Sequence, residues 1–321
     1  MLRRKALRKI IITTFSIVTI FTICIIPDKL NSNTNFLNPD IDTIYVNNIG
    51  TNEIYLLGPN KYLIKTNIIL NEEELEPKIK SIIDYLTINK SSKIPNGLSG
   101  LIPSDTILNS VDVNDGIATL DFSETLLNVS VDLEERVIEA IVYSLINIDG
   151  IEGVKIRING NFLTELPQSK KVLPDVLNRN FGINKVFDIN TLNNVQKITM
   201  YYLDKINNNY YYVPVTKYLN DEREKIKIII DNLSSNYIYE SSLLSLLNQN
   251  TELINYEIEE DVMRLNFNQN IFTNEKILEE VTYPISESVF DNYDVESVVF
   301  QVNGKDITET TKCCGIKIIK Q

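Results

Sequence analysis

The sequence predicts an α+β protein: two tandem copies of a small β-α-β-β-α-β module behind an N-terminal transmembrane helix. The first observation is a repeat, since Asp115–Ser123 can be placed over Glu260–Asn268, 145 residues further on, with the apolar positions coinciding. Two other blocks repeat in the same order at offsets of 147 and 144 residues: Lys78–Leu86 with Lys225–Leu233, and Ile151–Gly160 with Val295–Gly304. Three blocks at nearly one offset indicate a duplication. The second observation is that strand and helix periodicities alternate within each copy.

The first half of each module reads as a strand followed by a helix. Tyr62–Ile68 has the composition of a strand, and Tyr211–Val215 is its counterpart in the second copy. A helix is expected over roughly 73–89, because its apolar residues recur at helical spacing. These residues are Leu75, Ile79, Ile82, Ile83 and Leu86.

The second half reads as a hairpin, a helix and a closing strand. The strands 106–113 and 117–122 flank Asn114-Asp115-Gly116, a tight-turn signal. Asp132 is the expected N-cap of the second helix, with Glu135 at the capping-box spacing. The helix is expected to bury Leu133, Val137, Ile141 and Leu145 and to turn Glu134 and Glu135 to water. The strand Val154–Ile158 then leads into the turn Asn159-Gly160, which completes a small sheet with two helices on one face.

The second copy keeps this order of elements. It differs in placing Pro284 inside its second helix. Proline lacks a backbone donor, so a kink is expected near Glu280.

Composition excludes several classes of protein. Of 321 residues, 43% are hydrophobic and 23% charged, which rules out a wholly disordered or collagen-like chain. There is no histidine, which removes Ser-His-Asp and Cys-His catalysis and histidine zinc sites. Three cysteines are too few for a disulfide scaffold or a four-thiolate metal site.

Charge is divided unevenly along the chain. The total is −12, but residues 1–27 hold five basic residues and no acidic one. Residues 28–321 hold 26 basic and 43 acidic residues, a net charge of −17. Because so acidic a surface repels phosphate backbones, no nucleic-acid partner is expected.

A membrane segment is predicted at 10–26, where 17 uncharged residues follow the basic cluster. The positive-inside rule leaves residues 1–9 in the cytoplasm and the modules outside. We favour an uncleaved signal anchor, since no small-x-small cleavage site precedes Pro27. Lipidation of Cys24 is the second possibility, although Ile23 is bulky for a lipoprotein signal.

The predicted organisation has seven parts. They are a cytoplasmic segment (1–9), a transmembrane signal anchor (10–26), a linker (27–40), the first module (41–166), a linker (167–195), the second module (196–309) and a tail (310–321).

The first module resembles a known family. The run Ile94–Thr106, the turn Asn114-Asp115-Gly116 and Leu120–Ser123 resemble the GerM family, called the sporulation and spore germination domain. Ala140–Leu145, Gly150–Val154 and the closing Asn159-Gly160 continue the match in order. The resemblance covers nearly all of 41–309, as tandem GerMN-like modules. It departs in the second copy, where Leu247–Thr251 replaces the Ile-Pro-x-x-Thr element.

The resemblance implies a surface-exposed membrane protein or lipoprotein of Gram-positive spore formers. Members of the family act in sporulation, in germination and in assembling the envelope complex between mother cell and forespore. Their modules are similar to the ring-building motifs of secretion-type assemblies, which pack against one another. No catalytic residue carries over.

Paired carboxylates could support glycoside hydrolysis, with peptidoglycan as the substrate. Asp115, Asp121 and Glu124 are the nearest candidates. Asp115 is also a hairpin-turn residue, and Asp121 falls at Asn266 in the second copy, so its charge is not kept. We therefore favour structural roles and assign no catalytic residue.

Three other groups of residues are weighed in the same way. The acidic groups Glu72, Glu73 and Glu74, and Glu257, Glu259, Glu260 and Asp261, lack the spacing of a calcium loop and are interpreted as solvated faces. Cys313-Cys314 lacks C-x-x-C spacing, which leaves free thiols or an intermolecular bridge. The tyrosines Tyr201, Tyr202, Tyr210, Tyr211 and Tyr212 indicate strand packing, or a surface for a partner or glycan.

We therefore expect a non-catalytic, membrane-anchored assembly protein without metal or cofactor. Its modules would dock onto envelope or membrane proteins, or onto other copies of the chain, by helix–sheet or edge-strand contacts. The alternative is an extracytoplasmic module that binds peptidoglycan or a small ligand, and a hydrolase is third.

Overall fold

The computed structural model describes residues 51–235, 242–312 and 315–318, which belong to one compact unit. The predicted membrane segment 10–26 and its flanks, together with Cys24, Cys313 and Cys314, lie outside the described residues. Among the described residues, no helix combines the length and the apolar composition that a membrane span requires.

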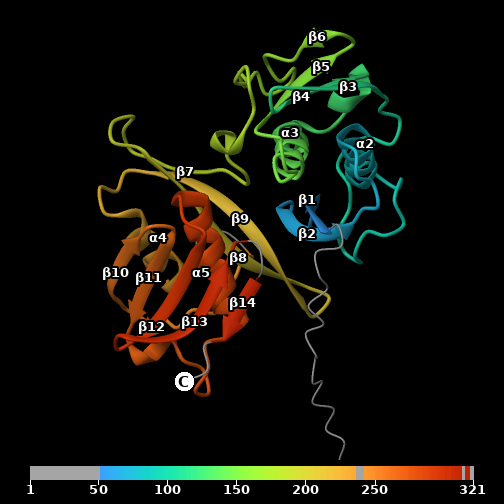
Figure 1. Ribbon diagram of the computed structural model, residues 1–321. Coiled ribbons are helices and arrows are strands. Elements are labelled where there is room, and N and C mark those ends of the chain that lie inside the picture. The colour runs from blue at the N-terminus through green and yellow to red at the C-terminus, as the bar shows by residue number, and fades with distance from the viewer. Residues whose placement is uncertain (1–50, 236–241, 313–314, 319–321) are drawn as a thin grey trace, which may run out of the picture. The chain divides into compact units, whose positions relative to one another are not determined.

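The first module contains the predicted β-α-β-β-α-β order with an additional strand at each end (Figure 1). Its elements are β1 (Thr51–Leu57), β2 (Leu63–Ile69), α2 (Leu75–Leu86), β3 (Leu108–Asn114), β4 (Ile117–Phe122), α3 (Val131–Leu145), β5 (Gly153–Ile158) and β6 (Asn161–Phe162). In Figure 1 both helices lie between the β1–β2 hairpin and the sheet β3-β4-β5-β6. The helices therefore have strands on two sides, where the sequence predicted one.

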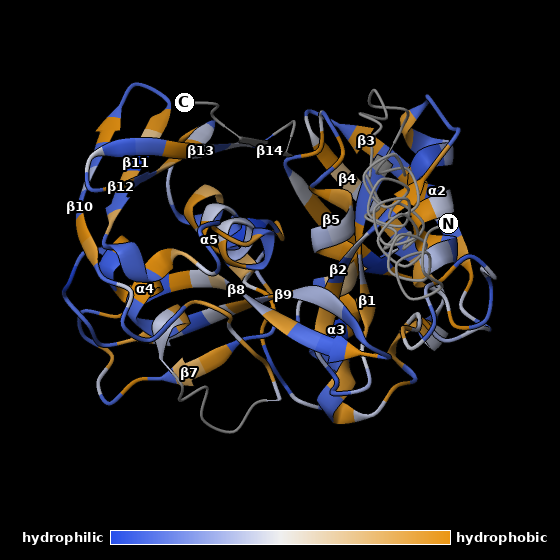
Figure 2. Cartoon of the chain, turned by 90° about the horizontal axis from the view of Figure 1, so that it is seen from below, coloured by the Kyte–Doolittle hydropathy of each residue, from blue (hydrophilic) through white to orange (hydrophobic). Residues whose placement is uncertain are grey.

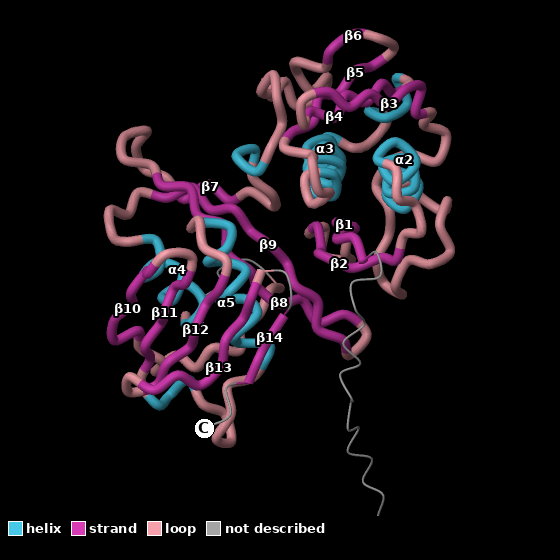
Figure 3. The backbone as a smooth tube through the Cα atoms, viewed as in Figure 1, coloured by secondary structure: helices cyan, strands magenta, loops and turns pink. Residues whose placement is uncertain are grey.

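The second module repeats this arrangement (Figure 3). Its elements are β8 (Gln196–Ile206), β9 (Asn209–Leu219), α4 (Lys225–Ser234), β10 (Leu253–Glu259), β11 (Val262–Phe267), α5 (Glu279–Asn292), β12 (Ser297–Val302), β13 (Lys305–Thr311) and β14 (Gly315–Ile318). Pro284 lies inside α5, as the sequence indicates. Strands β13 and β14 continue the sheet past position 309, so part of the predicted tail belongs to the fold.

The two modules share one unusual pairing. β4 runs parallel to β5, and β11 runs parallel to β12, while the other pairs within their sheets are antiparallel. A parallel pair needs a crossover connection, which α3 and α5 supply. Apolar residues on strands and helices form the core of each module. Figure 2 shows how hydrophobic and hydrophilic residues are distributed along these elements.

The β3–β4 hairpin and helix α3 test the local predictions. The hairpin is confirmed: Asp115 (φ 49°) and Gly116 (φ 75°) form its two-residue loop. The capping prediction is wrong, because Ser130 is the N-cap residue and Asp132 pairs with Lys61 at 2.6 Å. Lys61 belongs to the β1–β2 loop, which sequence reasoning did not place beside this helix.

The expectation that Glu134 faces water is also wrong. Glu134 is fully buried, and its two carboxylate oxygens accept the N–H groups of Gln168 and Ser169, each at 2.8 Å. The physical reason is that α3 has strands on two sides and the start of the predicted linker 167–195 on another. The same segment contains β7 (Val186–Asp188), which pairs with β9.

Candidate functional site: the junction between the modules

The two modules are joined through their N-terminal hairpins. β2 pairs with β9 in antiparallel orientation, with Lys65 opposite Tyr212. The two hairpins and β7 thus form one five-stranded sheet that crosses from module to module. Backbone pairing of this kind fixes the two hairpins in a defined register.

The free edges of β1 and β8 are covered by helices in the same way in both modules. The N–H of Tyr55 in β1 donates to Ser144 Oγ of α3 at 3.0 Å. The N–H of Tyr201 in β8 donates to Ser288 Oγ of α5 at 2.9 Å. Asn292 of α5 also bonds both backbone groups of Thr199. The outward backbone N–H groups of Tyr55, Tyr201 and Thr199 are thus bound to helix side chains, which leaves less of these two edges open to an added strand.

Asn184 fills a gap in the sheet where β2 meets β9. Its Oδ1 accepts the N–H of Leu63 at 2.9 Å, and its Nδ2 donates to the carbonyls of Leu63 and Pro214 at 2.8 and 2.7 Å. Proline has no N–H, so Pro214 has no donor to offer Leu63. The fully buried Asn184 supplies that donor, and its own N–H donates to Glu139 at 3.0 Å.

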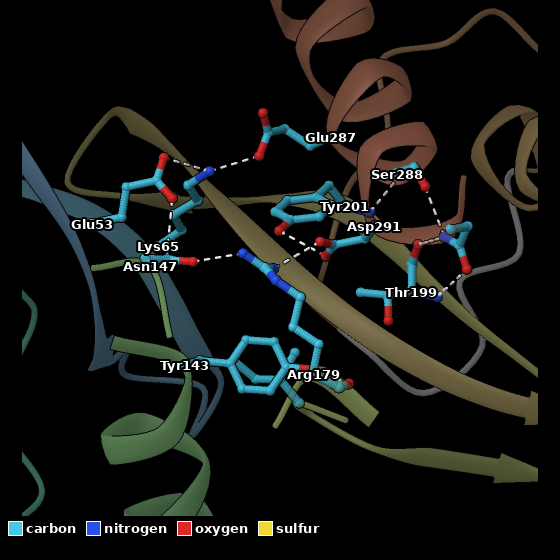
Figure 4. A network of polar contacts seen from close by, with 12 residues as sticks. Glu53, Lys65, Tyr143, Asn147, Arg179, Thr199, Tyr201, Glu287, Ser288 and Asp291 are labelled. Atoms are coloured by element: carbon cyan, nitrogen blue, oxygen red, sulfur yellow. Dashed lines mark hydrogen bonds and ion pairs between the residues drawn. The ribbon is translucent and has the colours of Figure 1, made fainter. Parts of the chain in front are cut away.

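Lys65 forms a buried ionic bridge between the modules (Figure 4). Its Nζ lies 2.7 Å from Glu53 of β1 and 2.6 Å from Glu287 of α5, and only 7% of its side chain is exposed. The rings of Tyr201 and Tyr283 lie within 6 Å of the ammonium group, at 5.7 and 5.6 Å. The lysine therefore connects the first hairpin to the second module in a largely water-free setting.

Opposing effects act on the pKa values of this bridge. Burial alone would lower the pKa of Lys65, but the adjacent Glu287 and Glu53 carboxylates hold it well above its usual value. Burial raises the pKa of Glu287, against the attraction of Lys65. Two carboxylates thus share one ammonium ion, which favours a permanently charged lysine.

Arg179 links equivalent ends of α3 and α5, as Figure 4 shows. Its guanidinium donates to Asn147 Oδ1 at 2.6 Å, just past α3, and to Asp291 Oδ1 at 2.9 Å on α5. The other oxygen of Asp291 accepts the hydroxyl of Tyr201 at 3.0 Å. The carbonyl of Arg179 accepts the hydroxyl of Tyr143 at 3.0 Å. A residue of the predicted linker therefore contacts both modules.

Two of the candidate carboxylates, Asp115 and Asp121, lie at a turn and in a strand of the first module. Asp115 lies in the β3–β4 turn, and Asp121 lies in β4, four residues and about 13 Å beyond the first strand residue Ile117. Asp121 accepts the N–H of Gly160 at 2.8 Å. Asn266 accepts the N–H of Gly304 at 3.0 Å in the second module. The shared role of Asp121 and Asn266 is to hold a turn, for which an amide suffices.

Several of the other residues singled out in the sequence make hydrogen bonds or packing contacts. Glu72 accepts the hydroxyl of Ser81 at 2.7 Å, ahead of α2. Tyr201 and Tyr202 are buried, and Tyr212 packs on Tyr283 with ring centroids 4.1 Å apart. Strand packing therefore accounts for Tyr201, Tyr202 and Tyr212, whereas Tyr210 is 39% exposed. Among the described residues, no group of three or more acidic or cysteine side chains has the geometry of a metal site.

An open polar pocket of about 260 Å³ lies beside β9 and α4 in the second module. Its amide and ammonium groups already have partners within the chain. Lys217 donates to Asn232 at 2.8 Å, and Asn220 bonds the backbone of residues 190, 191 and 193. Asn220 thus holds the segment around Asn190 at one wall of the pocket.

These features define a class: tandem α+β modules joined edge to edge, with polar groups used for packing and turns. A family model described as "Germane: Sporulation and spore germination" matches residues 53–164 and 199–308. The chain belongs to this family, with tandem GerMN domains.

One similar protein, compared both by its sequence and by its solved structure, supports this assignment. The spore germination protein GerM of Bacillus subtilis (strain 168) is 33% identical over 263 residues, which cover 79% of this chain and 71% of that protein. The solved structure of the tandem GerMN domains of the sporulation protein GerM from Bacillus subtilis is 32% identical, with a TM-score of 0.73. That match covers 79% of this chain and 91% of the solved one. The chain is therefore a GerM homologue of sporulation and spore germination.

Proposed function

We propose that this chain is a non-catalytic, membrane-anchored protein that assembles an envelope complex through its tandem modules. The observation that carries the proposal is the junction: a shared sheet, the Asn184 contacts and the Lys65 bridge join the two modules. A joined pair presents two sets of outer surfaces in a fixed relation, which suits a protein that positions partners.

Absence of catalysis is part of the proposal. Asp115 is a turn residue and Asp121 accepts a hydrogen bond, and Asn266 takes the place of Asp121 in the second copy. Glycoside hydrolysis needs two carboxyl groups within about 10 Å across a substrate cleft. Asp115 and Asp121 do not meet that requirement.

Membrane anchoring follows from the sequence. The uncharged run 10–26 behind five basic residues favours a single span with the modules outside the cell membrane. The partners we propose are envelope or membrane proteins of the sporulation complex. A reporter fused to the C-terminus tests the orientation, and reporter activity in the cytoplasm would contradict it.

The test of the proposed function is deletion of the gene in its spore-forming host, with heat-resistant and germinating spores counted. The wild-type chain should restore the count. The junction variant Asn184→Asp should restore it poorly, while Asn208→Asp, in an exposed turn, should restore it fully. A deletion strain that sporulates and germinates normally would refute the proposal.

The alternative functions have their own measurements. Retention of the chain on insoluble peptidoglycan would favour a wall-binding module. Clearing in a peptidoglycan zymogram that Asp121→Asn abolishes would establish a hydrolase.

A further inference from the structure

We propose that the edge strand β10 binds an extended segment of a partner protein, in which apolar residues alternate with lysine or arginine, by adding it as a strand. This inference rests on the proposed assembly function and assigns it a surface. Among the described residues, β10 pairs with β11 alone, at one end of the sheet β10-β11-β12-β13-β14.

The register identifies which backbone groups of β10 are free. Glu259 lies opposite Val262 across a two-residue loop, so these two residues exchange backbone hydrogen bonds. Bonded and non-bonded pairs alternate along an antiparallel ladder, which makes Glu257 and Arg264 the next bonded pair. The N–H and C=O groups of Tyr256 and Ile258 therefore point to the free edge, where an added strand finds two donors and two acceptors.

The side chains of β10 are unusually apolar for an edge. Ile254 is 55% exposed and Ile258 is 45% exposed. The equivalent edge strand of the first module is β3, where Asn109 takes the place of Ile254 and the half-buried Val113 that of Ile258. Edge strands that remain unpaired usually carry polar or charged side chains. β10 departs from that rule and β3 follows it.

The negative charges of β10 and its turn determine which kind of strand can pair with its free edge. Glu257 and Glu259 flank Ile258, and Glu260 and Asp261 follow in the turn. An incoming strand with basic residues at the intervening positions would meet these carboxylates across the pair. A second copy of β10 would bring Glu257 and Glu259 against the same residues of its partner, and like charges in that position are destabilising. A basic partner segment is therefore favoured over self-pairing.

The test uses the full chain in detergent and a labelled peptide, Lys-Val-Lys-Ile-Lys-Val-Lys, followed by fluorescence anisotropy. Ile258→Pro removes a donor at the free edge and leaves the β10–β11 ladder intact. Val113→Pro makes the same change at the equivalent edge position of β3. Binding should weaken about tenfold or more with Ile258→Pro and stay unchanged with Val113→Pro. Circular dichroism confirms that both variants are folded.

Three results of the peptide-binding assay would overturn the inference. They are no binding of the basic peptide, equal binding by the wild type and Ile258→Pro, and equal binding of a peptide with glutamate in place of lysine. A dimer of the chain that Ile258→Pro converts to a monomer would assign the edge to a second copy and also overturn it.

The complementation assay separates this inference from the proposed function. If Ile258→Pro restores spores as well as the wild type does, the proposal that β10 binds the partner segment is wrong, and the proposed assembly function stands. If deletion of the gene leaves spores unaffected, the assembly function itself fails.

Discussion

Asp121 and Asn266 occupy equivalent positions in the two modules, and each accepts a hydrogen bond from the N–H of a turn glycine. The distances are 2.8 Å to Gly160 and 3.0 Å to Gly304. The shared element is a side-chain oxygen, while the charge differs. Position 121 therefore needs an acceptor and has no need of a carboxylate.

The first prediction follows from this pair. Asp121→Asn should leave the free energy of unfolding within about 0.5 kcal/mol of the wild type, because the amide oxygen replaces the carboxylate oxygen. Asp121→Ala should cost about 1 kcal/mol, since the turn N–H loses its partner. Urea denaturation followed by circular dichroism measures both. Equal losses in the two variants would show that charge matters at this site.

The second prediction concerns Asn184. Asn184→Asp should destabilise the chain by about 2–3 kcal/mol, because the variant loses two donors and turns an oxygen toward the carbonyls of Leu63 and Pro214. Aspartate tolerates the left-handed backbone at this residue (φ 48°), so the change adds no backbone strain to the lost hydrogen bonds and the buried charge. The matched control is Asn208→Asp, which has a similar backbone (φ 68°) in an exposed turn. Similar melting temperatures for both variants would contradict the role of Asn184.

Local structure could be predicted from this sequence to a large extent. The repeat, the apolar face of α2 and the Asp115-Gly116 hairpin depend on residues that are close together in the sequence. Hydrophobic periodicity and turn-residue preferences therefore reveal them. The orientation of Glu134 could not be predicted, because its partners Gln168 and Ser169 arrive from a later segment. A helix with little water-facing surface breaks the rule that its charged residues point outward.

The junction could not be predicted, because its contacts join residues far apart in the chain. Asn184 lies 121 residues from Leu63, and Lys65 lies 222 residues from Glu287. No pattern among neighbouring residues in the sequence indicates which of such distant residues will be in contact. One signal was present: Pro214 inside a strand indicates an edge or an irregular pairing. It marks the place where the sheet needs the side chain of Asn184.

The third prediction concerns the buried bridge at Lys65. Lys65→Met should destabilise the chain by about 3 kcal/mol, chiefly because the largely buried Glu287 loses its cation, which it shares with the more exposed Glu53. The double variant Lys65→Met/Glu287→Gln should recover part of the loss, since the more buried of the two unpaired carboxylates is removed. Lys80→Met is the control, since its exposed pair with Glu76 is worth under about 1 kcal/mol. An additive double variant would mean that Lys65 and Glu287 do not interact.

The last prediction is a loss of stability at alkaline pH. Burial raises the pKa of Tyr55 to about 12, and it also raises the pKa values of Tyr143, Tyr201 and Tyr202 above their usual range. In the unfolded chain a tyrosine loses its proton near pH 10. Between these values the folded state binds more protons than the unfolded state, so the free energy of unfolding falls as the pH rises.

Each buried tyrosine then removes up to about 1.4 kcal/mol per pH unit above pH 10. We expect the 295 nm absorbance of these tyrosinates to appear together with the loss of far-ultraviolet circular dichroism. Tyr55→Phe should reduce the slope of the free energy of unfolding against pH by the contribution of one bound proton. Full tyrosine ionisation near pH 10 with the circular dichroism unchanged would contradict the burial of these side chains, and with it the packing of β1 and β8 against α3 and α5.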